Sequence, residues 1–155
     1  MGLIKFVKQA GAKVLGKDKD LTKTEDFQEL RQGNLLMQHV MGLGLEIDDL
    51  KITYDDGVAS VFGKTESQAE REKVILAVGN TKDVESVDDM IQVVKAEPEA
   101  VYYTVISGDS LSKIAKAQYG DAMKYPLIFE ANQPMLTDPD KIYPGQVLRI
   151  PPLEA

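Results

Sequence analysis

The last third of the chain carries the most restrictive pattern in the sequence, because turn and capping residues punctuate it at short intervals. Alternation over residues 102–105 predicts a strand, and Gly108 and Asp109 predict the turn that ends it. Ser110 is suited to cap a helix in which apolar residues recur at helical spacing as far as Gly120. A strand followed closely by a helix therefore opens this segment.

A second helix and a closing strand complete the segment. The second apolar set ends at Asn132, because Pro134 prevents further helix. A Pro-Gly pair then predicts a turn before a final strand over residues 147–150. The order strand, helix, helix, strand predicts a small α+β domain over residues 102–152.

This segment resembles a LysM module, because both end motifs sit at the separation typical of that family. LysM modules bind polymers of N-acetylglucosamine such as peptidoglycan, in a groove between the first strand–helix turn and the loop before the last strand. The resemblance therefore implies a candidate site for peptidoglycan or chitin-type glycan. Its residues would be Gly108, Asp109, Ser110, Leu111, Asn132, Pro134 and Met135.

The central part of the chain, residues 18–95, predicts a second α+β domain. A helix opens it, with Gly33 as a weak point at which the helix could break. A hairpin with an Asp-Gly turn follows, then a helix over residues 66–78 and a strand over residues 87–95. Residues 96–101 are a short charged linker that should hold the two domains close together.

The order helix, strand, strand, helix, strand resembles a BON domain. The residues that carry the resemblance are the hairpin segment 58–63, the segment Ala77-Val78-Gly79-Asn80 and the segment 84–89. The two resemblances together imply an α+β fold, in which an N-terminal helix and an αββαβ BON domain precede a βααβ LysM domain.

Ahead of the BON-like domain, apolar residues recur every three or four positions over residues 3–15, which predicts a short amphipathic helix. Residues 1–17 hold four lysines and no acidic residue, whereas residues 18–100 hold nine basic and nineteen acidic residues. We therefore expect this helix to dock on the acidic domain. Basic amphipathic helices also bind acidic membrane surfaces, so a membrane-associated BON protein is an alternative.

Composition excludes several classes of function. The chain has no cysteine and a single histidine, which excludes disulfides, thiolate catalysis and cysteine-ligated metals. It also lacks a phosphate-binding loop, and we expect no enzyme. Lysines interrupt every apolar run near the N-terminus, so we expect no secretory signal and no membrane-spanning segment there. The net charge of −7 disfavours binding to nucleic acid. We expect a cytoplasmic monomer that binds neither membranes nor nucleic acids, with a protein partner left open.

A BON domain followed by a LysM domain resembles a family of small cytoplasmic potassium-binding proteins of Gram-negative bacteria. The resemblance covers nearly the whole chain, including the start at Met1-Gly2-Leu3 and the tail from Ile128 to Pro151. It implies selective binding of one K⁺, compaction on binding, and a sensor role linked to osmotic stress.

K⁺ is large and weakly hydrated, and proteins select it with several backbone carbonyls that replace its water. Helix C-termini can supply them, because their last four carbonyls have no partner within the helix and carry partial negative charge. Two expected helix ends are followed by glycine, at Gly11 and Gly79; the alternative is that both are ordinary helix stops. Guided by the resemblance, we predict that K⁺ is bound by the backbone carbonyls of Val7, Ala10, Gly79, Thr81 and Val84.

Overall fold

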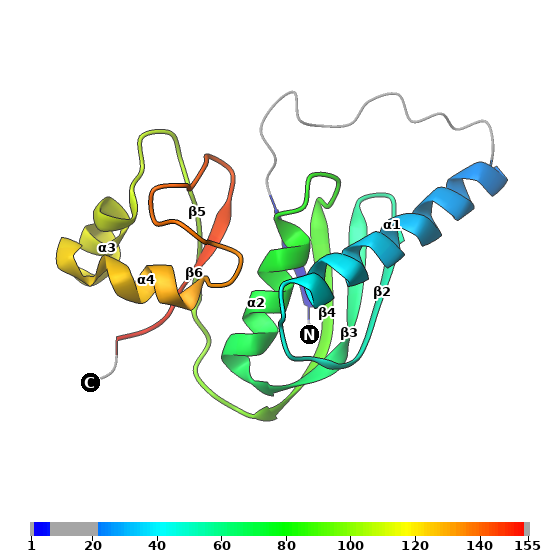
Figure 1. Cartoon of the computed structure of the whole chain (residues 1–155), viewed down its shortest axis with the longest axis horizontal. Coiled ribbons are helices and arrows are strands. Elements are labelled where there is room, and N and C mark those ends of the chain that lie inside the picture. The colour runs from blue at the N-terminus through cyan, green and yellow to red at the C-terminus, as the bar shows by residue number, and fades with distance from the viewer. Residues whose placement is uncertain (1, 7–21, 154–155) are drawn as a thin grey trace.

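The computed structural model describes residues 2–6 and 22–153, which form an N-terminal and a C-terminal domain (Figure 1). The N-terminal domain contains β1 (Gly2–Lys5), α1 (Thr22–Gly42), β2 (Asp48–Asp55), β3 (Val58–Ser67), α2 (Gln68–Gly79) and β4 (Ser86–Lys95). The C-terminal domain contains β5 (Val101–Thr104), α3 (Leu111–Tyr119), the 3-10 helix η1 (Ala122–Lys124), α4 (Tyr125–Ala131) and β6 (Val147–Ile150). The fold is α+β, and the predicted orders αββαβ and βααβ are confirmed.

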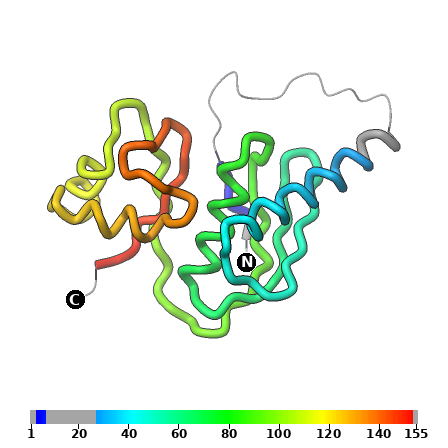
Figure 2. Tube along the Cα trace, viewed as in Figure 1, coloured from blue at the N-terminus to red at the C-terminus, as the bar shows by residue number. Residues whose placement is uncertain are grey.

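Four strands form the sheet of the N-terminal domain, in the order β1-β4-β3-β2. β2 and β3 form an antiparallel hairpin around Asp56 and Gly57, whose positive φ angles of 47° and 87° suit the turn. β3 and β4 run parallel, with α2 between them in the chain. α1 packs on β2, α2 packs on β3 and β4, and the two helices contact each other, so both cover the same face of the sheet (Figures 1 and 2).

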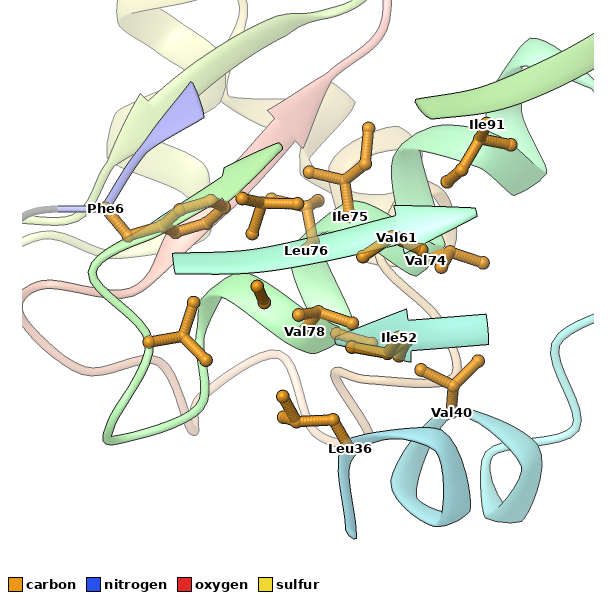
Figure 3. Close-up of a cluster of buried hydrophobic side chains, with 14 of the residues drawn as sticks. Phe6, Leu36, Val40, Ile52, Val61, Val74, Ile75, Leu76, Val78 and Ile91 are labelled. Atoms are coloured by element: carbon orange, nitrogen blue, oxygen red, sulfur yellow. The ribbon is translucent and has the colours of Figure 1, made fainter. Parts of the chain in front are cut away.

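The core of the N-terminal domain lies between this sheet and its two helices (Figure 3). Leu36 and Val40 of α1 are fully buried there, opposite Ile52 of β2. All residues from Val74 to Gly79 of α2 are buried, because the sheet covers one side of this helix and β6 of the C-terminal domain contacts another. α2 therefore belongs to the N-terminal domain and also contacts the C-terminal domain.

The prediction that α1 could break at Gly33 was wrong, because the helix runs without interruption from Thr22 to Gly42. A Cβ atom at Gly33 would lie 2.7 Å from the carbonyl oxygen of Ile52. Glycine therefore lets α1 pack closely on β2, and this contact outweighs its low helix propensity.

The prediction of a helix over residues 3–15 was wrong at its start, because residues 2–5 form strand β1, which pairs antiparallel with residues 86–89 of β4. Leu3 and Lys5 are exposed, whereas Ile4 is half-buried and Phe6 is buried, which is the alternation of a strand. The apolar spacing fits both structures, and pairing with the open edge of β4 decides between them. The rest of the predicted helix lies outside the described residues.

The C-terminal domain packs α3 and α4 with a two-stranded antiparallel sheet of β5 and β6. The predicted cap at Ser110 is confirmed, since its hydroxyl accepts from the N–H of Lys113 at 3.2 Å. Gly120 ends α3 with a φ angle of 79°, which is the left-handed conformation expected of a helix-terminating glycine. Local signals in the sequence thus set the ends of this helix.

Candidate functional site

The loop after α2 holds three of the five predicted K⁺ ligands: Gly79, Thr81 and Val84. α2 ends at Gly79, and the N–H of Asn80 donates to the carbonyl of Leu76 at 2.9 Å. The N–H of Val84 donates to the carbonyl of Thr81 at 3.1 Å, which closes the loop into a turn. The structure therefore places these three residues together at the C-terminal end of a buried helix.

Phe6 brings the end of strand β1 to the same loop. Its N–H donates to the carbonyl of Glu85 at 2.8 Å, and its ring packs directly on Gly79 with only 3% of the residue exposed. A Cβ atom at Gly79 would overlap the ring, so this position requires glycine for packing. The other two predicted ligands, Val7 and Ala10, follow Phe6 in the chain and lie outside the described residues.

The electrostatics around the loop favour a cation. The C-terminal end of α2 contributes partial negative charge, and the loop itself carries Asp83 and Glu85 against one lysine, Lys82. Tyr54 of β2 donates its hydroxyl to the carbonyl of Asp83 at 2.6 Å. Burial raises the pKa of Tyr54, and the charge of Asp83 raises this pKa further, because a negative neighbour disfavours a tyrosinate.

The contact between the two domains begins at the residue that follows Gly79. The side chain of Asn80 pairs with the backbone of Val147: Nδ2 donates to its carbonyl and Oδ1 accepts from its N–H, both at 2.9 Å. About two turns earlier on α2, Glu72 accepts from Nε of Arg149 at 2.9 Å, and both side chains are buried. Glu72 also accepts from the N–H of Ala100 at 3.0 Å. Two polar anchors therefore join α2 to β6.

Sequence reasoning missed these anchors and the contact of Phe6 with Gly79. Glu72 and Arg149 are 77 residues apart in the chain, so no local pattern links them. One signal was available in the sequence: Arg149 is a charged residue in the otherwise apolar closing strand 147–150. In the structure, all four residues of this strand are buried. A buried charge is rarely without a partner, and this arginine therefore indicated a contact with a group of opposite charge, although not where that group lies.

Most of the predicted glycan residues already serve the fold. Asn132 is 1% exposed, and its amide donates to the carbonyls of Ile128 and Arg149 at 2.7 and 3.0 Å. Met135 packs against the core of the N-terminal domain, and Pro134 follows a cis peptide bond. The loop before the last strand therefore shapes the domain and contacts its neighbour.

The turn between β5 and α3, which is the other side of the predicted groove, also uses its polar groups for internal hydrogen bonds. Asp109 accepts from the hydroxyl of Tyr103 at 2.7 Å and from the N–H of Ile106 at 2.9 Å. The hydrogen bond to Asp109 raises the pKa of Tyr103 to about 12. Leu111 is buried in the domain core, and Gly108, with a φ angle of 91°, completes the turn. The structure thus keeps the two loops of the predicted groove but uses most of their polar groups internally.

An acidic group lies at the hairpin turn, where one carboxylate oxygen each from Glu29, Asp55 and Asp56 falls within 4.8 Å of the others. Glu29 is half-buried and the two aspartates are exposed. Glu29 accepts from the N–H of Asp56 at 3.0 Å, so it caps the turn. In the part of the chain that the structure describes, no helix is long and apolar enough to cross a membrane.

Comparison with known proteins identifies both domains and one relative along almost the whole chain. Residues 37–95 match the BON domain, and residues 103–151 match the LysM domain. The potassium binding protein Kbp of Escherichia coli O6:H1 is 45% identical over 152 residues, which cover 97% of this chain and 99% of that protein. An uncharacterized protein of Deinococcus radiodurans is 57% identical over 49 residues, which are 19% of its length. The esterase Rv1288 of Mycobacterium tuberculosis is 49% identical over 53 residues, which are 11% of its length.

Proposed function

Because this chain belongs to the family of the potassium binding protein Kbp, we propose that it binds one K⁺ selectively through backbone carbonyls at the loop after α2. The protein is a binding protein rather than an enzyme, as its family and its BON and LysM domains indicate. The observation that carries the proposal is the meeting of Phe6 with Gly79 and Glu85, which brings the chain to the loop immediately before Val7.

The chemistry of the loop suits a large monovalent cation. The proposed ligands are the carbonyls of Val7, Ala10, Gly79, Thr81 and Val84, which are neutral and can replace the water of K⁺ without a high density of charge. The carbonyl of Thr81 accepts one hydrogen bond from Val84 and keeps a second lone pair for an ion. All residues from Val74 to Gly79 at this end of α2 are buried, so packing fixes the position of the helix end.

We also propose that K⁺ makes the protein more compact and that this change is read as a signal. An ion that binds only the closed arrangement stabilises it by RT ln(1 + [K⁺]/Kd), or about 2.7 kcal/mol at a hundredfold excess. The ion would tie the N-terminal segment to the loop, and the anchors on α2 would pass this order to β6. A cytoplasmic sensor of K⁺ during osmotic stress, with a protein partner still to be found, fits this behaviour.

The direct test is titration of the full chain with KCl and NaCl at equal ionic strength, followed by amide NMR and calorimetry. We expect saturable shifts of the amides of Gly79, Thr81 and Val84 with K⁺ alone. Gly79→Val, which displaces the Phe6 ring, should abolish them. Gly42→Val is the matched control, because this helix-terminal glycine has no atom within 4 Å of its Cβ position. Full K⁺ affinity in folded Gly79→Val would show that the proposed carbonyls are not the ligands.

A second candidate function is glycan binding, which the match of residues 103–151 to the LysM domain favours. The internal hydrogen bonds of Asn132 and the packing of Met135 on the other domain speak against a free groove. Titration with chitooligosaccharides distinguishes the two candidates. Millimolar or tighter sugar binding without any response to K⁺ would favour the glycan function, and co-sedimentation with acidic liposomes would identify a membrane-associated BON protein instead.

A further inference from the structure

The contact between the two domains is built on the same helix end as the proposed ion site. Asn80 lies between Gly79 and Thr81, so its backbone belongs to the loop, while its side chain belongs to the interface. Two hydrogen bonds of 2.9 Å hold the side-chain amide on Val147. The orientation of the peptide groups on either side of Asn80 therefore depends on where β6 lies.

We propose that Asn80 is the positioning residue that couples docking of the C-terminal domain to the geometry of the loop between α2 and β4. The identity of the ligand rests on the proposed function, whereas the mechanical link rests on the hydrogen bonds alone. In this arrangement, undocking of β6 releases Asn80 and changes the orientation of the peptide groups of Gly79 and Thr81.

Asparagine is suited to this role because its amide offers one acceptor and two donors and can imitate a peptide group. It satisfies both the N–H and the carbonyl of Val147, the first residue of β6. The side chain of Val147 is itself buried in the core of the N-terminal domain, so its backbone cannot shift without disturbing that core. The connection from β6 to the loop is therefore stiff.

The second anchor decides what happens when Asn80 is removed. Glu72 and Arg149 hold β6 to α2 at a point further from the loop, and Arg149 also donates to the carbonyl of Ala131 at 3.0 Å. With this anchor intact, the C-terminal domain stays docked when the amide of Asn80 is lost. Loss of Asn80 should therefore separate the loop from the interface without undocking or unfolding either domain.

The test compares the wild-type full chain with Asn80→Ala and with Asn34→Ala, an exposed asparagine of α1 that serves as the matched control. Each protein is titrated with KCl against NaCl and followed by NMR. Asn80→Ala should bind K⁺ about tenfold more weakly, equivalent to about 1.4 kcal/mol. The amides of Tyr102 and Arg149 should no longer respond to K⁺, although the Nε proton of Arg149 stays protected from exchange. The control should match the wild type.

An unchanged K⁺ midpoint and an unchanged response of the C-terminal domain in Asn80→Ala would overturn the proposal. If Asn80→Ala does not fold, Asn80→Ser takes its place, because serine stays polar and uncharged but cannot pair with both the N–H and the carbonyl of Val147. A folded Asn80→Ser must then bind K⁺ with reduced affinity, and wild-type affinity would refute the coupling.

Failure of the proposed function is recognised separately, as a wild type that shows no response to K⁺. The coupling is then judged from hydrogen exchange of the amides of Thr81 and Val84, which donate to the carbonyls of Val78 and Thr81. Faster exchange of both amides in Asn80→Ala supports the mechanical link. Exchange at the wild-type rate refutes it.

Discussion

The contact between Phe6 and Gly79 predicts that Gly79→Ala destabilises the wild-type protein but stabilises a variant that lacks the Phe6 ring. Alanine at Gly79 would force the Phe6 ring out of the space it fills, because a Cβ atom there overlaps the ring. The ring belongs to a residue that is 3% exposed, so its displacement should cost about 1.5–3 kcal/mol of burial. Alanine gains about 1 kcal/mol over glycine in a helix, which leaves a net destabilisation of about 0.5–2 kcal/mol.

In a Phe6→Ala background the same substitution should have the opposite effect. Removal of the ring alone should cost about 3–5 kcal/mol, as for other buried phenylalanines. Gly79 has a φ angle that alanine can adopt, and the three atoms nearest to its methyl group all belong to the Phe6 ring, so loss of the ring removes the closest overlap. Gly79→Ala should then stabilise the protein by up to about 1 kcal/mol. The interaction energy of the double-mutant cycle is thus about 1.5–3 kcal/mol.

The assay is urea unfolding of the four proteins, followed by circular dichroism in buffer without K⁺, so that ion binding does not enter the free energies. Equal slopes against urea are required for the comparison, because a changed slope would mean that the compactness of one state had changed. If Gly79→Ala is equally destabilising with and without the ring, the packing of β1 on the loop is wrong. The K⁺ site proposed from that packing then loses its support.

Three further predictions test other parts of the structure. Gly33→Ala should destabilise the protein by about 1–3 kcal/mol in urea unfolding, although alanine is the better helix former, because its Cβ would lie 2.7 Å from the carbonyl oxygen of Ile52. Glu72→Gln should cost about 3–5 kcal/mol in the same assay, since it leaves a guanidinium buried without its counter-charge; a near-neutral effect would show that the ion pair is open to water. The hydrogen bond to Asp109 raises the pKa of Tyr103 from 10.0 to about 12, so the stability it contributes is complete below pH 10.0 and is lost as the pH rises through about 12. Tyrosinate absorbance of an Asp109→Asn variant should show this pKa falling back toward 10.0.

Elements set by local signals could be predicted from the sequence. Ser110 and Gly120 bound α3 because capping and left-handed termination depend on a few neighbouring residues. The Asp-Gly turn fixed the β2–β3 hairpin for the same reason. The loop that holds Gly79, Thr81 and Val84 was also found, because a glycine at the end of an apolar helix is a local feature.

Elements decided by distant contacts could not be predicted. The start of the chain has an apolar spacing that fits a helix, yet Ile4 and Phe6 face inward from a strand because β4 offers an open edge more than eighty residues away. Gly33 has the low helix propensity of any glycine, and only the approach of β2 explains why α1 needs it. The partner of Glu72 lies in another domain, where no periodicity reaches.

The polar anchors of the domain contact suit the opening and closing that we propose. A buried ion pair adds little net stability relative to apolar packing, because desolvation offsets most of its Coulombic attraction. Glu72, Arg149 and Asn80 would all be well solvated if β6 left α2, although opening would also expose the buried Val147 and part of Met135. These polar groups make the closed arrangement specific without adding much to its stability. The binding energy of one ion would therefore shift the proposed equilibrium more readily than one held by apolar residues alone.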